Sequence, residues 1–200
     1  MSQTDNDILQ KQERFLRLLK PNHDSLARFA RAMTKSSEEA RDLVSDTVEQ
    51  AFKHLDSLKS DEAFLSWLFT IASRIEKRRR WRERIFERFD PILHDEAAET
   101  IARNPNTDAL YDTQILYDAL QKLPFKQREA FTLFEISGFS LQEIQEMQGD
   151  SLSAVKMRVV RAREALRTML GDTHTQERAT IHHLTNPAAT NQISISKDKG

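Results

Sequence analysis

Residues 140–166, SLQEIQEMQGDSLSAVKMRVVRAREAL, predict two helices joined by a tight turn. Ser140 and Glu143 have the spacing of a capping box, in which the serine accepts from a free backbone amide and the glutamate reaches back. Gly149, between the helices, suits the left-handed backbone conformation that a tight turn needs. Just after the turn, Ser151 or Ser153 can cap the second helix. The stretch therefore has the organisation of a helix-turn-helix unit.

The second of these helices combines an apolar face with a basic one. The residues with the three- and four-residue steps of a buried helix face are Val155, Val159, Ala162 and Leu166. Those that share an outward face near the helix start are Lys156, Met157, Val160 and Arg161. In a helix-turn-helix this face meets base edges in the major groove, where basic side chains reach guanine or phosphate and apolar ones reach thymine methyls. A solvated basic face is the alternative, but the capped helix, glycine turn and exposed basic helix together favour DNA.

Composition predicts a soluble, mostly helical protein of one domain or two small ones. The 200 residues are 38% hydrophobic and 30% charged, with only 4 Gly and 5 Pro. The net charge of −1 means that an argument for nucleic-acid binding must rest on local clusters. The chain has no cysteine, which excludes disulfides and thiolate metal sites. Without a long apolar run or a secretion signal, we expect a cytoplasmic protein with no membrane insertion.

The N-terminal half predicts a bundle of helices. Pro21 interrupts the first apolar pattern, and Ser36 with Glu39 forms a second candidate capping box before the next helix. On that helix Asp42 and Asp46 lie one turn apart on a shared face. This face is either an ordinary solvated surface or a docking site for a basic partner, and the residues alone leave both open.

A cationic segment follows at residues 74–84, RIEKRRRWRER, which holds seven basic and two acidic residues. Basic residues near a helix end are partly explained by the helix dipole, but this excess is larger than that role requires. With Trp67 and Trp81 nearby, the segment suits a nucleic-acid backbone together with stacking on unpaired bases. A membrane-surface helix would need a broader apolar face.

Residues 86–112 are acidic, contain Pro91 and Pro105 and lack a sustained period, so they predict a linker. The polar residues after Gly171 predict a disordered tail, in which the spacing of the histidines defines no metal geometry. We expect an all-α fold of two small helical domains joined by a flexible linker. The expected ranges are 8–88 for the first domain, 89–112 for the linker, 113–170 for the second domain and 171–200 for the tail.

Motifs of catalysis are missing from the sequence. It contains no glycine-rich phosphate loop, no nucleophile elbow and no histidine-glutamate metal pair. We therefore expect no enzymatic activity, no cofactor and no metal.

Two regions of the chain resemble one protein family. LARFARAMTKSSEEARDLVSDTVEQAFKHLDSL followed by AFLSWLFTIA resembles domain two of the extracytoplasmic-function (ECF) sigma factors. ALQKLPFKQREAFTLFEISGFSLQEIQEM and SAVKMRVVRAREALRTML resemble their domain four. The resemblance covers residues 12–85 and 114–170 in the family's order. It implies a dissociable subunit of bacterial RNA polymerase that directs the enzyme to promoters.

The resemblance also implies residue roles. Docking on the clamp helices of the polymerase β′ subunit is implied for Asp42, Leu43, Val44 and Asp46. Capture of the non-template strand of the minus-ten element is implied for Lys59, Ser60, Phe64, Trp67, Arg74, Lys77 and Arg78, to which the cationic segment adds Trp81. Reading of the minus-thirty-five element is expected of Arg128, Ser151, Ser153, Lys156, Met157, Val160 and Arg161. The second domain is also expected to contact the polymerase β flap.

Five positions depart from the family pattern. Asp46 stands where glutamate is usual, Arg74 where asparagine is frequent and Met157 where serine is frequent, so the promoter sequence stays open. Gln148 and Asp150 replace apolar residues of the turn, which predicts a looser second domain or an unusual partner.

Family members are commonly held inactive by an anti-sigma factor, so the resemblance implies such a partner besides promoter DNA and core polymerase. Two other classes stay open. One is a helix-turn-helix regulator that acts without polymerase, and the other is a sigma-like decoy that sequesters an anti-sigma factor. The basic, tryptophan-bearing helix favours the sigma factor, because a decoy has no need of residues that capture a strand.

Overall fold

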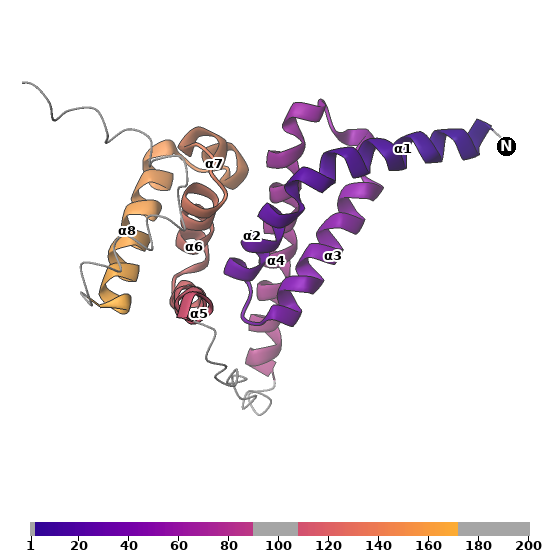
Figure 1. The fold of residues 1–200 in the computed structure, drawn as a ribbon. Coiled ribbons are helices and arrows are strands. Elements are labelled where there is room, and N and C mark those ends of the chain that lie inside the picture. The colour runs from indigo at the N-terminus through magenta and orange to yellow at the C-terminus, as the bar shows by residue number, and fades with distance from the viewer. Residues whose placement is uncertain (1–2, 90–107, 172–200) are drawn as a thin grey trace, which may run out of the picture. The chain divides into compact units, whose positions relative to one another are not determined.

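A computed structural model describes residues 3–89 and 108–171, and every regular element in these ranges is helical (Figure 1). The all-α prediction is confirmed. The chain divides into two compact units, Met1–Lys122 and Leu123–Gly200. Most of the predicted linker and all of the predicted tail beyond Gly171, with its histidines, lie outside the described residues.

The first unit is built on a three-helix core. Its elements are α1 (Gln3–Leu19), η1 (Lys20–Asn22), α2 (His23–Met33), α3 (Ser37–Lys53), η2 (Leu55–Ser57), η3 (Asp61–Ala63), α4 (Phe64–Phe89) and α5 (Asp108–Gln121). Helix α3 packs against both α2 and α4. The fully buried side chains at their centre include Phe29, Leu43, Leu68 and Phe69. The Phe29 and Phe69 ring centroids lie 5.0 Å apart, which joins α2 to α4.

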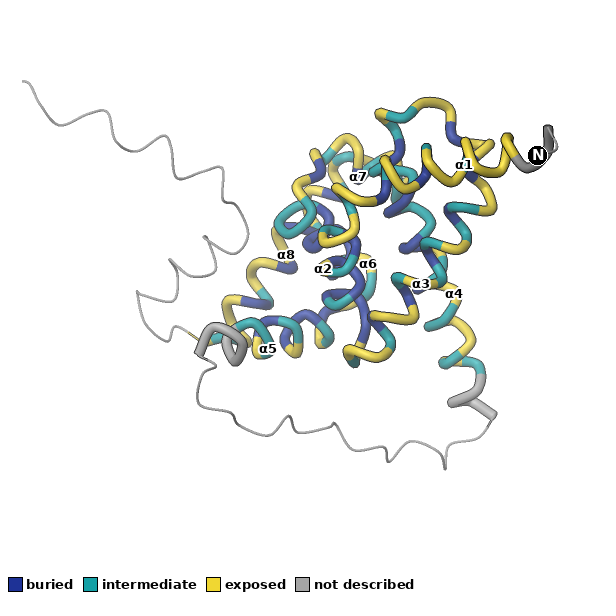
Figure 2. Tube along the Cα trace, turned by 45° about the vertical axis from the view of Figure 1, so that its right-hand side comes forward, coloured by how far each residue is buried: buried dark blue, intermediate teal, exposed yellow. Residues whose placement is uncertain are grey.

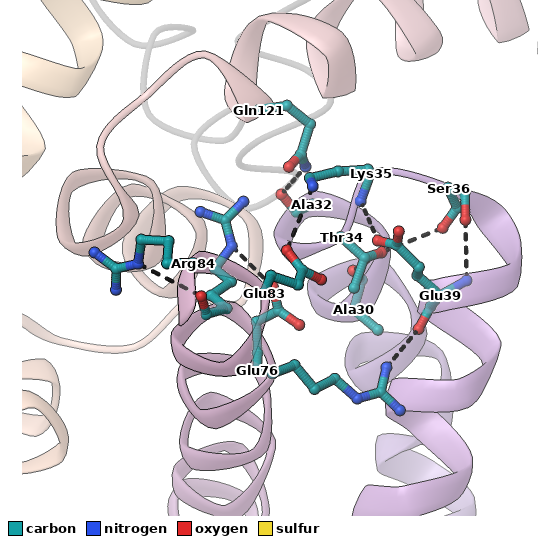
Figure 3. A network of polar contacts seen from close by, with 12 residues as sticks. Ala30, Ala32, Thr34, Lys35, Ser36, Glu39, Glu76, Glu83, Arg84 and Gln121 are labelled. Carbon is teal, nitrogen blue, oxygen red and sulfur yellow. Dashed lines mark hydrogen bonds and ion pairs between the residues drawn. The ribbon is translucent and has the colours of Figure 1, made fainter. Parts of the chain in front are cut away.

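Breaks between helices follow the predicted signals. The short η1 turn contains Pro21, whose missing amide and locked φ angle end α1 and allow α2 to start in a new direction. Ser36 caps α3, since its hydroxyl accepts from the Glu39 amide at 3.1 Å (Figure 3). The Glu39 carboxylate, however, accepts from the Lys35 amide at 2.8 Å, so the return contact falls one residue before the predicted capping box.

Helix α5 begins at Asp108, inside the predicted linker, and packs against α2. The Gln121 side-chain amide donates to the Ala32 carbonyl at 2.9 Å (Figure 3), and the Arg31 guanidinium lies 5.0 Å from the centre of the Tyr117 ring. The boundary between compact units therefore follows α5, whereas the sequence pattern predicts it before residue 113. Apolar periodicity reports which side of a helix is buried but not which neighbour buries it.

The second unit contains the helix-turn-helix. Its elements are α6 (Phe125–Phe131), the π-helical turn η4 (Thr132–Ile136), α7 (Leu141–Gln148) and α8 (Leu152–Leu170). Both halves of the capping box between Ser140 and Glu143 are present. Gly149 ends α7 with φ of 67°, the left-handed conformation expected of the turn. Helix α8 then packs against α6 and α7.

We predict that Gly149→Ala lowers the free energy of unfolding of the second unit by about 1 kcal/mol, because an L side chain is strained at this φ. An added Cβ would meet nothing within 4 Å, so backbone strain is the only cost. Chemical denaturation followed by circular dichroism measures the change. Gly149→Asn is the matched variant and should lose less, since asparagine tolerates the left-handed region. Equal stability of the alanine variant and the parent would contradict the assignment.

Candidate nucleic-acid and polymerase interfaces

Helix α8 presents the outward face that its periodicity predicts. Val155, Val159, Ala162 and Leu166 are buried at 4% exposure or less. The exposed residues of the early outward face are Lys156, Met157, Val160 and Arg161. Met157 is 48% exposed and Val160 40%, so apolar surface lies open beside the two cations. Buried and exposed positions alternate along α8, as Figure 2 shows. The face combines two cations with two apolar groups, the set that can read a mixed base-pair edge.

The two serines at the start of α8 differ in their contacts. The Ser151 hydroxyl accepts from the Ala154 amide at 3.2 Å and caps the helix. Ser153 is exposed on the first turn. Of the two predicted caps, Ser151 is the one used, which leaves Ser153 as the serine whose hydroxyl is available to a partner on this surface.

Arg128, which the family pattern assigns to the minus-thirty-five surface, is fully buried in α6. A side chain with no exposed area cannot touch duplex DNA in this structure. Its place is in the core beneath α8, where it supports the outward face from inside. The motif gives a residue type at a spacing and carries no information on burial, which explains the difference.

Gln148 and Asp150 build a polar network at the turn. Asp150 accepts from Arg158 and from Lys126, both at 2.8 Å. The Gln148 amide accepts from Arg158 at 2.6 Å and donates to the Glu129 carboxylate at 2.7 Å. The network joins α6, the turn and α8 by side chains from all three. These contacts stand where apolar packing is usual, and the expectation of a looser domain or an unusual partner stays a prediction.

The same network perturbs the titration of Asp150. Hydrogen bonds from Arg158 and then Lys126, with the charges of both groups, lower the pKa of its carboxyl from 3.8 to about 2. Asp150 therefore stays ionised over the whole physiological range, and Arg158 stays paired with it.

The cationic segment on α4 divides into an outer and an inner set. The exposed cations are Arg74, Lys77, Arg78, Arg82 and Arg84. Trp81 lies among them and is 59% exposed. The inner set is paired: Arg80 donates to the buried Glu76 at 3.0 Å, and Arg79 donates to Asp46 at 2.6 Å. The outward surface of α4 therefore keeps five exposed cations, and Glu83 beside them pairs with Lys35 at 3.4 Å.

Residues predicted to contact core polymerase are only partly on the surface of α3. Asp42 is exposed, and Val44 and Asp46 are half-buried. Leu43 is fully buried in the core, so it holds the helix in place and contacts no partner directly. The Asp46 carboxylate is shared with Arg79 of α4, which couples this face to the cationic helix.

The loop between α3 and α4 carries two of the predicted strand-capturing residues on its surface. Lys59 and Ser60 are exposed. Phe64 is 1% exposed, with its ring centroid 6.0 Å from that of the half-buried Trp67. Phe64 is therefore a core residue at the start of α4, and a flipped base would have to meet Lys59, Ser60 or the edge of Trp67.

Sequence reasoning missed the charged residues of α1 that contact this loop. Arg14 and Arg17 both donate to Asp61, and Lys11 donates to Asp56. The sequence did hold a weak signal, because the cations at positions 11, 14 and 17 recur every three residues and so lie on one side of a helix. Their partners lie 44 to 47 residues away, where no local pattern points to them.

Within residues 3–89 and 108–171, no group of three or more His, Cys, Asp or Glu side chains could hold a metal ion. None of the helices in this described part of the chain is long and apolar enough to cross a bilayer.

We predict that the second unit is destabilised as pH falls from about 4 toward 2. The pKa of Asp150 is depressed in the folded state, so its contribution is complete above the ordinary value of 3.8 and is lost as pH falls through about 2. Unfolding free energies measured across this range test the point. Asp150→Asn should remove this part of the pH dependence, and an unchanged slope in that variant would contradict it.

Comparison with known proteins also divides the chain in two, but it groups most of α5 with the second part. Residues 18–84 match the family Sigma-70 region 2, and residues 113–166 match Sigma-70, region 4. The first range covers α2, α3 and most of α4, and the second covers α6, α7 and most of α8 together with most of α5.

Curated relatives span most of the chain. The ECF RNA polymerase sigma factor EcfG of Rhodopseudomonas palustris is 34% identical over 149 residues, which are 73% of this chain and 79% of that protein. The ECF RNA polymerase sigma factor SigM of Mycobacterium tuberculosis is 30% identical over 160 residues, 78% of this chain and 77% of its own length.

Two solved structures are also similar to this chain over most of its length. The sigma factor RpoE of Bartonella quintana, crystallised with the anti-sigma factor NepR, is 32% identical with a TM-score of 0.65 and covers 78% of this chain and 96% of its own. CnrH, in complex with the cytosolic domain of CnrY, is 26% identical with a TM-score of 0.61, covering 84% and 96%. ECF sigma factors are transcription initiation factors that bind RNA polymerase and promoter DNA, and this chain belongs to the ECF sigma factors of the sigma-70 family.

Proposed function

We propose that this chain binds RNA polymerase core and directs it to promoters, with the first unit recognising and melting the minus-ten element and the second reading the minus-thirty-five element. The supporting observation is that each unit carries an exposed cationic surface of its own, on α4 and on α8. One of them adds an exposed tryptophan and the other two exposed aliphatic side chains. These additions suit unpaired bases and duplex base edges respectively.

On α4 the proposed chemistry is capture of a single strand. Arg74, Lys77 and Arg78 attract the phosphates, and Trp81 offers a ring on which a base can stack. Lys59 and Ser60 on the adjoining loop receive a base that has left the duplex. Contacts of this kind offset the few kcal/mol needed to unstack and unpair a base.

On α8 the proposed chemistry is readout of the major groove. Lys156 and Arg161 donate to guanine acceptors or to phosphates, while Met157 and Val160 contact thymine methyl groups. Ser153, on the first turn of α8, can donate to a phosphate or a base edge. The network around Asp150 supports this reading by holding the start of α8 against α6.

For the polymerase, we propose that α3, with Asp42, Val44 and Asp46, docks on the clamp helices of the β′ subunit. The acidic groups of Asp42 and Asp46, one turn apart, suit a basic partner surface, and the half-buried Val44 lies on another side of the helix. The second unit would contact the β flap. Core polymerase then holds the two DNA-binding surfaces at the separation of the promoter elements.

Regulation by an anti-sigma factor is part of the proposal. The structures of RpoE and CnrH are complexes, the first with the anti-sigma factor NepR and the second with the cytosolic domain of CnrY. We expect a comparable protein to bind this chain and to withhold it from polymerase in the cytoplasm.

The test is run-off transcription with bacterial core polymerase on a genomic promoter library. The proposal predicts transcripts that require both the chain and a specific set of promoters. A regulator independent of polymerase would bind operators as a purified protein and leave initiation by core unaltered. A decoy would bind an anti-sigma factor and start no transcripts. Either result would overturn the proposed function.

We predict that Lys156→Ala and Arg161→Ala each weaken binding to a selected promoter by about 1–3 kcal/mol if the side chain contacts a base. Arg167→Ala is the matched control, because it removes the same charge from a later turn of the same helix. This control should lower the affinity for the promoter less, and it should leave the preferred promoter sequence unchanged. Electrophoretic mobility shifts with the reconstituted holoenzyme measure both, and equal effects of all three substitutions would contradict base readout by this face.

We predict that Trp81→Ala lowers the affinity of the holoenzyme for a single-stranded minus-ten oligonucleotide by about 1–3 kcal/mol, the value of one base–aromatic stack. Fluorescence anisotropy with a labelled oligonucleotide measures it. Binding of the variant to core polymerase should equal that of the parent, since Trp81 lies on the cationic face of α4 and not on α3. Unaltered affinity for the single strand would show that the ring does not stack.

A further inference from the structure

The strongest feature that the proposed function does not use is the attachment of α1 to the loop at residues 54–63, between α3 and α4. The residues of α1 that make it, here called the α1 clamp, are Lys11, Arg14, Phe15 and Arg17. The loop holds the η2 and η3 turns and, between them, the exposed Lys59 and Ser60. The matched Sigma-70 region 2 begins only at residue 18, so the clamp lies before it in the chain.

Asp61 is the centre of the clamp. Arg14 donates to its Oδ1 from Nε at 2.9 Å and from the terminal nitrogen at 2.7 Å. Arg17 donates to Oδ2 at 3.1 Å. Two guanidinium groups therefore engage both oxygens of one carboxylate, a geometry more directional than a single surface ion pair. Side-chain hydrogen bonding from Arg14, helped by the charges of both arginines, lowers the pKa of Asp61 and keeps it ionised.

A second ion pair and an aromatic anchor hold the other parts of the loop. Lys11 donates to Asp56 at 2.5 Å, so the loop is tied on both sides of Lys59 and Ser60. Beneath these pairs Phe15 is 4% exposed, with its ring 5.3 Å from that of Phe52 and 6.0 Å from that of Phe64. The edge-to-face contacts fix α1 to the last turn of α3 and the first turn of α4.

The loop has little backbone structure of its own. Its turns are closed by backbone amides: Ser57 donates to His54 at 2.9 Å, Leu58 to Leu55 at 3.0 Å and Ala63 to Ser60 at 3.2 Å. Single 3₁₀ turns of this kind have poor hydrogen-bond geometry and hold a conformation weakly. Leu55 and Leu58 anchor the loop in the core, with Leu55 fully buried. The exposed part of the loop around Lys59 to Asp61 gains its further contacts from α1.

Charge adds a second reason for the clamp. The loop itself is acidic, since Asp56, Asp61 and Glu62 outnumber Lys59 in residues 54–63. Its carboxylates would repel the phosphates of a bound strand. With Arg14 and Arg17 bound to Asp61, the three groups together carry a net positive charge. The clamp thus makes an acidic residue acceptable in a loop that faces nucleic acid.

We propose that α1 is a positioning element for strand capture. Arg14 and Arg17, acting through Asp61, hold the loop so that Lys59 and Ser60 meet one extruded base in a defined orientation, and the clamp thereby sets selectivity for that base. This inference rests on the proposed function of the first unit and assigns Arg14, Arg17 and Asp61 to positioning rather than to contact with DNA.

The first arm of the test is hydrogen exchange on the full chain without polymerase. Arg14→Gln and Asp61→Asn should each raise amide exchange in residues 57–63 by about fivefold, because the loop opens more often once the ion pairs to α1 are lost. Lys53→Gln is the matched control, because it removes a cation that pairs with Glu49 within α3 and not with a carboxylate of the loop. Unaltered exchange in both clamp variants would overturn the proposal.

The second arm measures selectivity in the holoenzyme. The readout is the ratio of affinities for single-stranded minus-ten oligonucleotides that carry the preferred base or each alternative at the captured position. Arg14→Gln and Asp61→Asn should each reduce this ratio about fivefold, and the double variant should lose no more than either alone, because the three groups act as one unit. Exchanging the charges, with Arg14→Asp and Asp61→Arg together, should restore part of the ratio.

Other outcomes overturn the inference. If Arg14→Gln weakens binding to every oligonucleotide equally while Asp61→Asn does not, Arg14 contacts phosphate directly. If the losses add, the residues act separately. Should the parent protein fail to bind core polymerase or single strands, the proposed function fails. The exchange arm would still report whether the clamp orders the loop, so the two failures are distinguishable.

Discussion

The continuity of α4 is the constraint on which the first unit depends. One helix of 26 residues begins in the hydrophobic core, with Phe64, Leu68 and Phe69 buried, and ends in the exposed cations that follow Arg74. Because a helix is stiff over this length, packing of its first half against α2 and α3 sets the direction of its second half. The Arg79 contact to Asp46 adds a tie partway along, where the core ends. The packing of the core therefore determines the direction in which the cationic surface of α4 points.

Charge pairing explains how a chain with a net charge of −1 presents strongly basic faces. Three acidic residues near those faces are paired with arginines: Glu76 with Arg80, Asp46 with Arg79, and Asp150 with Arg158. Each pair contributes little free energy by itself at a partly exposed site. The pairs neutralise these carboxylates and tie together the helices that carry the outward cations. Overall charge is a poor guide to nucleic-acid binding in such a protein, and local placement is the informative quantity.

Much of the fold follows from periodicity and caps. The faces of α8, the capping box at Ser140 and the left-handed Gly149 all depend on residues within a few positions of one another, and local physics determines them. The burial of Arg128 and Phe64 could not be predicted, because a motif gives spacing and not surroundings. The Gln148 and Asp150 network and the arginines on Asp61 were missed for another reason. Ion pairs between residues far apart in the chain form only when the tertiary structure brings them together, so the periodicity of the sequence does not predict them.

The central claim is that the two cationic surfaces serve promoter recognition and opening by polymerase. Permanganate reactivity of thymines in the minus-ten element tests it most directly, since the reagent modifies thymines that have left the duplex. With core polymerase and this chain together on a selected promoter, the non-template thymines should become reactive, and with core alone they should not. Reactivity that stays at the level of core alone, while the chain is bound to the enzyme on the same template, would contradict the account.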